Sequence, residues 1–430
     1  MENRKLFAFA NGRLVGSLLD TNDIWSFAYE DDWVNSEGAF PLSPKIPLTV
    51  ERLVDGSSER PVQWFFDNLL PEEAMREVIA REAKLDTSDA WGLLSYFGRE
   101  TAGALTLLGE GDDEPAGGRQ ILTLEELETR IQAMPQQALT AKAPKRMSAA
   151  GAQQKLLVIM DGQPPECTLF EPVGSEPSMH LLKPDQRSTN YPHSAINEFF
   201  CMQLARKMGL KVPPTHFLRA PSPCYLIDRF DRDSSTQPAT RRHTLDATQL
   251  LGISRAYKYH EANVESLRRC IELTSTKATT RLTIFQWSVF NVLIGNADAH
   301  LKNISFFSTD RGYNLAPFYD MVSTVAYNNI TYQASGERWP NCELTIPLGN
   351  AKFFNEVTRD EVLVFAEQLG LRRAGAERVL DGFLAGLDDK VLQVREAVNA
   401  IAKPNAGEHR LLTGIEVKPL KEMGRKLARA

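Results

Sequence analysis

Residues 295–303, GNADAHLKN, and residues 317–320, PFYD, carry more information about this chain than any other part of its sequence. Asp298 and Asn303 form an Asp-x-x-x-x-Asn spacing, and Asp320 follows after a short interval. Protein kinases use such a set, in which one Asp orients the attacking hydroxyl while an Asn and a second Asp hold Mg²⁺ on the phosphates. The pattern therefore predicts phosphoryl transfer from ATP, with Asp298 as the catalytic base and Asn303 and Asp320 as metal ligands.

The residues around this motif predict the elements that would hold it. Residues 283–294 are apolar on nearly every face and predict a buried helix. Residues 304–307 and 313–315 predict two strands joined by a turn, a hairpin that would return Asp320 to the side of Asn303. The competing interpretation is a plain turn after a helix, because Asn, Asp and Gly are common in turns. The joint spacing favours the catalytic interpretation.

Composition is that of an ordinary globular protein. The chain has 430 residues, 43% of them hydrophobic and 24% charged, enough for a large core divided into two or three lobes. Five scattered cysteines without a Cys-x-x-Cys pair exclude a zinc ribbon and favour reduced thiols. A net charge of −6 gives no general attraction to nucleic acid. With no signal-peptide core and no apolar run long enough to span a bilayer, we expect a cytoplasmic protein without membrane contact.

The order of patterns along the chain predicts an α+β, two-lobed fold like that of protein kinases. Residues 1–108 are expected to form an extra amino-terminal α+β subdomain, 109–234 the ATP-binding part of the amino-terminal lobe ending in the hinge, and 235–430 a mainly helical carboxy-terminal lobe. The basic segment 409–430 fits either a solvated helix face or a patch that contacts phosphates.

Individual elements follow from local patterns. The predicted strands are 6–9 and 14–18 around an Asn-Gly turn, 98–108, 156–160 before a turn at Asp161-Gly162, 180–183 and 224–227. Residues 109–120 are expected to be a loop. The predicted helices are 64–83 with an interruption at Pro71, one opened by Thr123, 194–208, and one opened by Thr358.

A cation for the ATP phosphates is expected at Lys183. It ends a predicted strand, and the helix that follows carries Glu198, which could pair with it as the helix Glu does in protein kinases. Asn197 stands beside Glu198, so the sequence leaves the pairing partner open. The competing interpretation is that Lys183-Pro184 closes an edge strand.

Small residues at 148–155, SAAGAQQK, could bring backbone N–H groups close to phosphates. The segment matches neither Gly-x-Gly-x-x-Gly nor a Walker loop, and a flexible entry loop is the alternative. Residues 228–230 follow a strand where a hinge to adenine should lie. The sequence has no Gly-x-Ser-x-Gly elbow and no His-Glu-x-x-His, which argues against hydrolase chemistry.

Seven blocks together resemble the HipA family, the kinase toxins of bacterial type II toxin–antitoxin systems, along nearly the full chain. The blocks are NGRLVG at 11–16, FFDNLLP at 65–71, GRETAGA at 98–104, SAAGAQQK at 148–155, YLIDRFDR at 225–232, GNADAHLKN at 295–303 and PFYD at 317–320. The resemblance implies a fold distantly related to eukaryotic protein kinases and phosphatidylinositol kinases. It also implies phosphorylation of a protein hydroxyl with ATP and Mg²⁺, the substrate being an aminoacyl-tRNA synthetase such as the glutamyl enzyme. The implied partners are a small helix-turn-helix antitoxin of the HipB type and, through it, operator DNA.

The resemblance also implies roles for individual residues. Asp298 is the implied base, Asn303 and Asp320 are metal-linked and contact ATP, and Ser148 is a site of self-phosphorylation that silences the kinase. The other implied ATP contacts are Ala150, Gly151, Ala152, Gln153, Gln154, Lys155, Lys183, Asp228, Arg229, Phe230, His300 and Tyr319. A phosphate on Ser148 would either repel the nucleotide's phosphates or draw the loop outward toward Lys145 and Arg146.

One departure from the family affects the larger lobe. Family members often carry Gln-Glu-Asp near its start, whereas this chain has Thr244-Leu245-Asp246 and retains only the Asp. Two functions therefore stay open. The first is an active serine/threonine kinase toxin that inhibits growth, and the second is a weakly active or inactive kinase-like co-repressor that works in a DNA-bound complex. The intact Asp298 motif favours the first.

Overall fold

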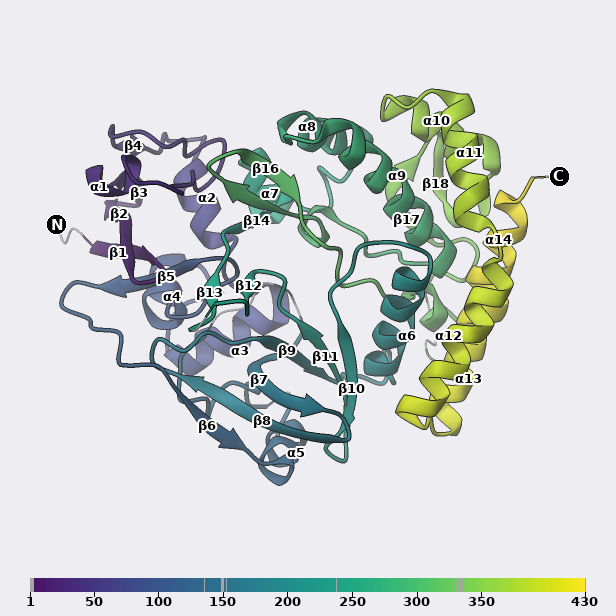
Figure 1. Ribbon diagram of the computed structural model, residues 1–430, viewed down its shortest axis with the longest axis horizontal. Helices are drawn as coiled ribbons and strands as arrows, with labels where there is room; N and C mark the ends of the chain where they lie inside the picture. The colour runs from purple at the N-terminus through teal and green to yellow at the C-terminus, as the bar shows by residue number, and fades with distance from the viewer. Residues whose placement is uncertain are drawn as a thin grey trace.

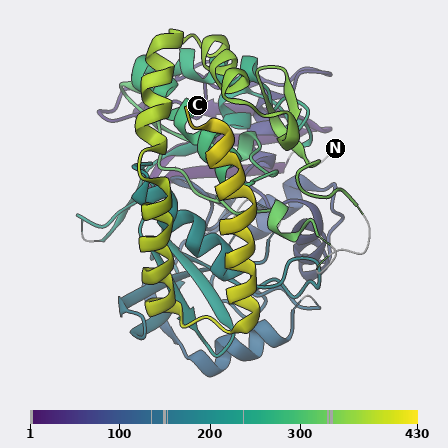
Figure 2. The ribbon, with the colours of Figure 1, turned by 90° about the vertical axis from the view of Figure 1, so that its right-hand side faces the viewer.

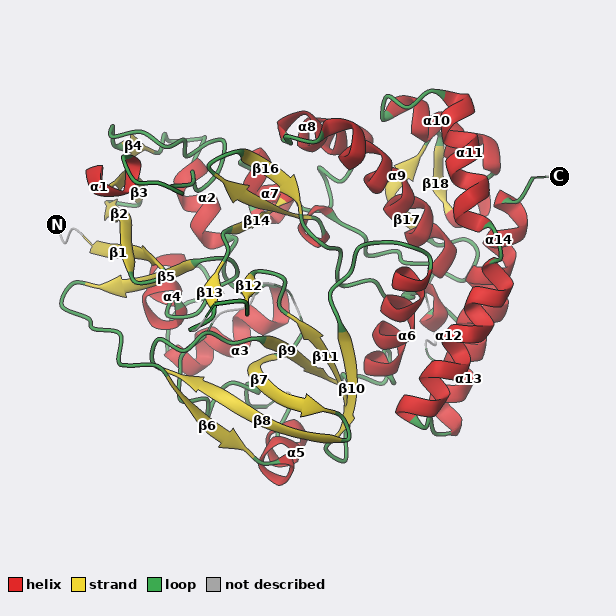
Figure 3. Cartoon of the chain, in the orientation of Figure 1, coloured by secondary structure: helices red, strands yellow, loops and turns green. Residues whose placement is uncertain are grey.

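The computed structural model describes residues 4–134, 136–147, 151, 153–236, 238–329, 332 and 336–429. Figure 1 shows an amino-terminal sheet at the upper left, a second sheet below it and a carboxy-terminal group of helices at the right. Figure 3 shows that strands dominate the first two parts and helices the third. The predicted α+β order, β-rich before helical, is confirmed. The division at residues 108 and 234 stays a prediction.

The first sheet is antiparallel and has five strands, with β1 in the inner position next to the edge strand β5. Its order is β4 (Leu53–Val54), β3 (Ile24–Tyr29), β2 (Arg13–Thr21), β1 (Arg4–Ala10) and β5 (Leu105–Gly109). Asn11 and Gly12 join β1 to β2 with φ of 49° and 77°, the positive values that a tight hairpin turn needs. The predicted hairpin is confirmed. The helices of this part are α1 (Asp31–Val34), α2 (Pro61–Asp67), α3 (Glu73–Ala83) and α4 (Ala90–Phe97).

The prediction of one strand over residues 98–108 is wrong for its first half. Gly98 caps α4, and only Leu105–Gly109 forms a strand. Gly103 has φ of +78°, and a Cβ there would lie 2.9 Å from the carbonyl oxygen of Thr244. The segment before β5 is therefore a loop that is pressed against the carboxy-terminal lobe.

The second sheet has six antiparallel strands. Its order is β10 (Thr215–Arg219), β11 (Pro223–Asp228), β9 (His180–Pro184), β7 (Leu156–Gln163), β8 (Glu166–Val173) and β6 (Gly118–Leu122). The helix α5 (Leu124–Gln132) begins at Thr123, whose side chain accepts the Glu126 N–H, and α6 (Ser194–Lys207) lies against β10 and β11. Both helices and the strands β7, β9 and β11 were predicted and are confirmed.

Two predictions in this sheet are wrong. The end of the expected loop at 109–120 contributes to β6, a mostly exposed edge strand whose polar residues hide the strand pattern. The turn expected at Asp161-Gly162 lies at Pro164-Pro165 instead, because Asp161 pairs with Thr168 and Gly162 with Cys167. Both errors arise because β8 supplies the pairing partner, which local composition does not reveal.

The carboxy-terminal part is largely helical. Its helices are α7 (Ala247–Leu251), α8 (Val264–Leu273), α9 (Lys277–Ile294), α10 (Arg359–Gln368), α11 (Arg373–Leu384), α12 (Leu387–Ala402), α13 (Ala406–Ile415) and α14 (Lys421–Leu427), with the single-turn η1 (Arg255–Tyr257), η2 (Leu301–Asn303), η3 (Val325–Tyr327) and η4 (Phe354–Glu356) and the π-helical η5 (Glu416–Leu420). Its small sheets are β12 (Arg232–Asp233) with β13 (Thr240–Arg241), β14 (Thr244–Asp246) with β15 (Ser305–Thr309) and β16 (Gly312–Leu315), and β17 (Glu343–Leu348) with β18 (Ala351–Phe353). Thr358 caps α10 by accepting the Glu361 N–H, as predicted.

The last helices cover one side of the molecule. Figure 2 shows α12 and the continuous run α13–η5–α14 as two long neighbouring helices, which an ion pair between Arg395 and Glu416 joins. Most of the basic residues of segment 409–430 are exposed on this run, as a solvated helix face requires. Within the described part of the chain, no helix is long and apolar enough to cross a membrane.

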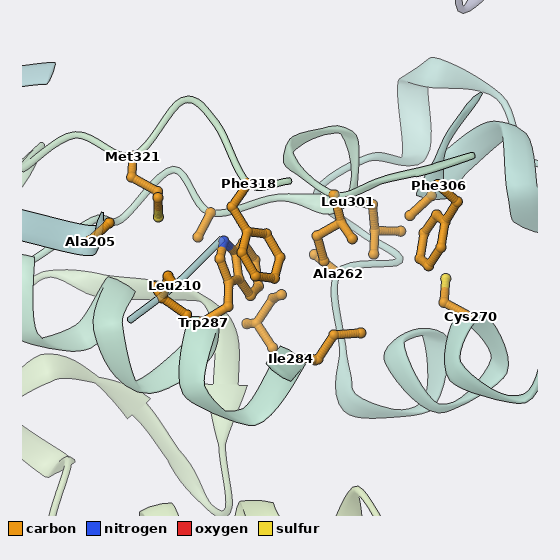
Figure 4. Packing of buried hydrophobic residues seen from close by; sticks show 14 of the residues in the cluster. Ala205, Leu210, Ala262, Cys270, Ile284, Trp287, Leu301, Phe306, Phe318 and Met321 are labelled. Carbon is orange, nitrogen blue, oxygen red and sulfur yellow. The ribbon is translucent and has the colours of Figure 1, made fainter. Parts of the chain in front are cut away.

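The buried helix α9 organises the carboxy-terminal core, as predicted. It ends at Gly295, which adopts φ of +66°, and a Cβ there would lie 2.2 Å from the Val325 side chain. Trp287 on α9 stacks on Phe318 with ring centroids 5.7 Å apart, and Figure 4 shows this pair among the packed residues. The same helix thus leads into the Asp298 loop and anchors the segment that carries Asp320.

A buried ion cluster around Glu100 joins the three parts of the chain. The carboxylate has no exposed surface and accepts hydrogen bonds from Lys145 (2.9 Å), Arg232 (2.7 Å) and Arg241 (2.7 Å), with Arg229 at 3.3 Å. Burial opposes ionisation, but these four cations outweigh it and hold the pKa of Glu100 well below its ordinary value. The carboxylate therefore stays charged and ties the loop before β5 to Arg229, to Arg232 and to β13.

Replacing this carboxylate is expected to destabilise the protein strongly. Glu100→Gln would leave its cationic partners buried without their counter-charge, and breaking a buried pair in this way typically costs about 3–5 kcal/mol. The free energy of unfolding, measured by urea titration at pH 7, would show the loss.

Glu272→Gln is the matched control, because Glu272 is an exposed partner of Lys277 and Arg281. Since the pKa of Glu100 is lowered on folding, its contribution is present above the ordinary Glu pKa and is lost as pH falls toward the folded value. Wild type and Glu100→Gln should therefore converge in stability in acid. Equal stability at pH 7 would contradict the role of the cluster.

Candidate active site

The structure brings seven of the sequence-predicted site residues to one cavity of about 550 Å³. The cavity lies between the amino-terminal parts and the carboxy-terminal lobe. Among the residues that line it are Gly151, Gln153, Glu198, Asp298, His300, Asn303, Tyr319 and Asp320. The hairpin β15–β16 returns the chain as expected, so that the two acidic side chains of the motif, Asp298 and Asp320, line the same space.

Asp298 is held from its backbone and from its side chain. Asn303 Nδ2 donates to the Asp298 carbonyl oxygen at 2.8 Å, and the Asp298 N–H donates to Asn296 Oδ1 at 3.0 Å. The Tyr259 hydroxyl donates to Asp298 Oδ1 at 2.8 Å. Burial raises the pKa of Asp298, and His300 and Tyr259 partly offset this rise. A carboxylate with a raised pKa in a cavity suits a group that accepts a proton.

Lys183 reaches the cavity from β9 and pairs with Glu198, not with Asn197. Its Nζ lies 2.8 and 3.1 Å from the two carboxylate oxygens of Glu198 and also contacts Asp320. Asn197 instead donates to the Ser323 carbonyl oxygen. Burial alone would lower the pKa of Lys183, but Asp320 and Glu198 outweigh it and raise that pKa. The Lys183 side chain is therefore protonated at neutral pH.

The carboxylate of Asp320 is ionised and contacts the Lys183 ammonium. Burial opposes its charge, but Lys183 and Lys155 outweigh burial and hold its pKa at about 2. Asp320 has φ of +58°, a left-handed conformation that is uncommon for Asp. Burial, reinforced by Lys183, lowers the pKa of Lys155 to about 8. Lys155 Nζ lies close to Gly151, where an added Cβ would be 2.5 Å from it.

The residues fit an Mg²⁺–nucleotide complex. The carboxylate of Asp320 and the amide oxygen of Asn303 are the hard oxygen ligands that Mg²⁺ prefers beside phosphates. His300 Nδ1 is buried and has no hydrogen-bond partner among the described residues, as expected of an atom that awaits a ligand. Tyr319 donates its hydroxyl to the Lys302 carbonyl oxygen at 2.7 Å, which fixes the ring at the cavity wall.

The residues predicted to form the hinge do not line this cavity. Asp228, Arg229 and Phe230 line a neighbouring cavity of about 900 Å³. The N–H groups of Asp228 and Arg229 donate to the carbonyl oxygens of Pro214 and Met179, so both are used within the chain. Phe230 connects the two cavities, because its ring stacks on Tyr319 with centroids 5.6 Å apart.

Asp228 also belongs to a cluster with two histidines. His216 Nε2 lies 2.9 Å and His180 Nε2 3.6 Å from Asp228 Oδ1, a spacing that could suit a metal ion. His180 Nδ1 accepts the Met160 N–H at 3.1 Å, however, so the neutral ring carries its proton on Nε2. That proton faces Asp228, and the arrangement is better explained as a carboxylate that accepts from imidazoles.

The segment 148–155, predicted to lie against phosphates, is described only in part. Ser148, Ala150 and Ala152 lie outside the described residues. Gln153 lines the cavity, whereas the Gln154 side chain accepts the Leu139 N–H at 2.9 Å and points to the segment before the loop.

Several cavity residues were not found from the sequence, and most belong to distant segments. Lys302 Nζ donates to Asn68 Oδ1 at 2.8 Å and to Asp246 Oδ2 at 2.7 Å, and Lys258 pairs with Glu72 at 2.6 Å. The retained Asp246 thus anchors the Asp298 loop through Lys302. The blocks 65–71 and 295–303 contain Asn68 and Lys302, so the resemblance marked both segments without showing that they meet.

Comparisons with known proteins cover almost the whole chain. The family model for the HipA N-terminal domain matches residues 6–108, and that for the HipA-like C-terminal domain matches residues 147–391. A putative kinase of Sinorhizobium fredii is 32% identical over 412 residues, covering 92% of this chain and 93% of that protein. The serine/threonine-protein kinase toxin HipA of Shewanella oneidensis is 31% identical over 376 residues, covering 82% of this chain and 80% of that protein.

A solved structure shows the same likeness in three dimensions. HipA of Shewanella oneidensis, in a complex with HipB and operator DNA, matches with a TM-score of 0.80 at 25% identity. The match covers 98% of this chain and 97% of the other. The predicted two-lobed fold is thereby confirmed over 98% of the chain.

Proposed function

This chain belongs to the HipA family, and we propose that it is an ATP- and Mg²⁺-dependent serine/threonine protein kinase that acts as the toxin of a toxin–antitoxin pair. The observation that carries the proposal is the convergence of Asp298, Asn303, Asp320 and the Lys183–Glu198 pair at one cavity. Each member has the chemistry that a kinase site requires.

The residues divide the work of phosphoryl transfer. Asp298 accepts the proton of a serine or threonine hydroxyl as that oxygen attacks the γ-phosphorus of ATP. The bond between the γ-phosphorus and the oxygen bridging to the β-phosphorus breaks, and ADP leaves. Asn303 and Asp320 would hold Mg²⁺, which neutralises charge on the phosphates when bound. Lys183 and Lys155 face the same phosphates, and His300 and Tyr319 line the nucleotide. Asp228, Arg229 and Phe230 are proposed to contact adenine, with Phe230 the member that touches the catalytic cavity through Tyr319.

We extend the proposal to partners. A cytoplasmic aminoacyl-tRNA synthetase, such as the glutamyl enzyme, is the proposed substrate, and a small helix-turn-helix antitoxin of the HipB type would link the chain to operator DNA. The solved complex of the Shewanella relative with HipB and its operator supports this arrangement. The competing function, an inactive co-repressor, is disfavoured because no expected catalytic side chain is replaced.

The experiment combines purified protein, Mg²⁺, γ-labelled ATP and purified glutamyl-tRNA synthetase. Label in the synthetase is expected, together with loss of its charging activity. Label in the chain itself but not in the synthetase would exclude this synthetase as the substrate and support the kinase activity. No label in any protein, the chain itself included, would favour the co-repressor function.

Self-phosphorylation of Ser148 is expected to switch the kinase off. A phosphate there would add roughly −1.5 to −2 charges beside the nucleotide's own phosphates. Lys145 is paired with Glu100, and Arg146 lies 3.8 Å from the Tyr96 ring centroid. Ser148 lies outside the described residues, so repulsion of the nucleotide's phosphates and attraction of the loop toward Lys145 and Arg146 both stay predictions.

Mass spectrometry after incubation with Mg²⁺–ATP would locate the modification, and calorimetry would follow ATP affinity. Phosphate on Ser148 with lost ATP binding is expected for wild type, and neither for Asp298→Asn. A modified protein that keeps full ATP affinity would rule the switch out.

A further inference from the structure

The hydroxyl of Tyr259 occupies one side of the carboxylate that the proposed mechanism uses as base. It donates a 2.8 Å hydrogen bond to Asp298 Oδ1. Asn303 and Asn296 hold only the backbone of Asp298, so their contacts do not restrict rotation of the carboxylate about its side-chain bonds. Among the described residues, the Tyr259 hydroxyl is the hydrogen-bond donor to the Asp298 carboxylate, and it contacts Oδ1 and not Oδ2.

The position of Tyr259 is itself fixed by its surroundings. Its ring meets the His300 ring edge to face with centroids 5.0 Å apart, and Lys258 Nζ lies 4.9 Å from its centroid. Lys258 in turn pairs with Glu72 at 2.6 Å and Glu73 at 2.9 Å, at the start of α3. A chain of contacts thus runs from the amino-terminal subdomain through Lys258 and Tyr259 to the base.

The location of Tyr259 also suits a role at the substrate side. It lies in the loop between η1 and α8, and 46% of its surface is exposed although its hydroxyl is engaged. It lines the cavity together with Glu73, and its hydrogen bond goes to Asp298 rather than to the Lys183–Glu198 pair. A residue so placed can act on the attacking group without contacting the phosphates.

We propose that Tyr259 is a positioning residue for phosphoryl transfer, which orients the Asp298 carboxylate toward the substrate hydroxyl. This inference rests on the proposed kinase function. A hydrogen bond to an ionised group is among the stronger ones that proteins make, and a misoriented base loses rate without losing nucleotide affinity.

The test compares Tyr259→Phe with wild type in phosphoryl transfer. The variant keeps the ring, its packing on His300 and its contact with Lys258. We expect kcat to fall roughly tenfold or more, the size typical of a hydrogen bond to a charged group. KM and the dissociation constant for Mg²⁺–ATP should stay unchanged, which a general structural defect would not allow. Tyr257→Phe is the matched control, since Tyr257 is 51% exposed two residues earlier.

A double-mutant cycle asks whether Tyr259 acts through Asp298. In an Asp298→Ala background, measured by single turnover, Tyr259→Phe should cause no further loss. An equal loss in both backgrounds, unchanged kcat in Tyr259→Phe, or a rise in kcat from removal of a blocking phenol would each overturn the inference and leave the kinase function standing. A wild-type chain that transfers no phosphate would overturn both.

Discussion

Asp298→Asn is expected to lower the rate of phosphoryl transfer by roughly 10²–10⁴-fold, the usual contribution of a general base, and to abolish growth inhibition. The amide keeps the size of the side chain and can still accept the Tyr259 hydroxyl, but it cannot take a proton at neutral pH. Burial raises the pKa of Asp298 because it disfavours the charged carboxylate, and the carboxylate therefore accepts a proton more readily. Since Lys183, Lys155 and Asp320 are untouched, ATP affinity should be retained.

Initial rates of phosphate transfer, with ATP binding measured separately by calorimetry, would check this result. Asp310→Asn is the matched control, because Asp310 lies exposed in the turn of the β15–β16 hairpin, 12 positions along the chain. A variant that phosphorylates protein at the wild-type rate would remove Asp298 from the mechanism. If the variant loses ATP binding as well as the rate of phosphate transfer, the substitution has instead disrupted the structure of the site.

Asp320→Ala is expected to weaken Mg²⁺–ATP binding and to lower kcat/KM by roughly 10²–10³-fold, the size found when one electrostatic stabiliser is lost. The variant removes an oxygen ligand of the metal and also frees Lys183, which then keeps its contact with Glu198. The freed Lys183 can then contact the phosphates, so metal-free ATP should bind with similar or higher affinity. The affinity for Mg²⁺–ATP should therefore fall while that for metal-free ATP does not.

Calorimetric titration with ATP in excess Mg²⁺ and in a chelator separates the two forms. Asp389→Ala, in the exposed first turn of α12, controls for the loss of a carboxylate elsewhere. Equal affinity of mutant and wild type for Mg²⁺–ATP would exclude Asp320 as a ligand. An equal loss of affinity for Mg²⁺–ATP and for metal-free ATP would show that Asp320 maintains the structure of the site and does not bind the metal.

Elements whose signals are local could be predicted from the order of the residues alone. The apolar run of α9, its end before Gly295 and the hairpin that follows are set by neighbouring residues, so these elements were predicted correctly, although α9 begins at Lys277 and not at residue 283. Asn303 and Asp320 line one cavity. The same holds for the β1–β2 hairpin and for the caps of α5 and α10. Spacing within one segment is likewise local, which is why the Asp298 motif is recognisable from its residue types and their intervals.

Features that depend on distant partners could be assigned only in the folded chain. The edge strand β6 and the length of β7 follow from pairing with β8, and the choice of Glu198 over Asn197 follows from which face of α6 meets β9. The wall of the cavity unites Glu72, Lys258 and Lys302, residues up to 230 positions apart. Buried charges are stable only when opposite charges from other segments surround them, and that requirement is met in space and leaves no pattern along the chain.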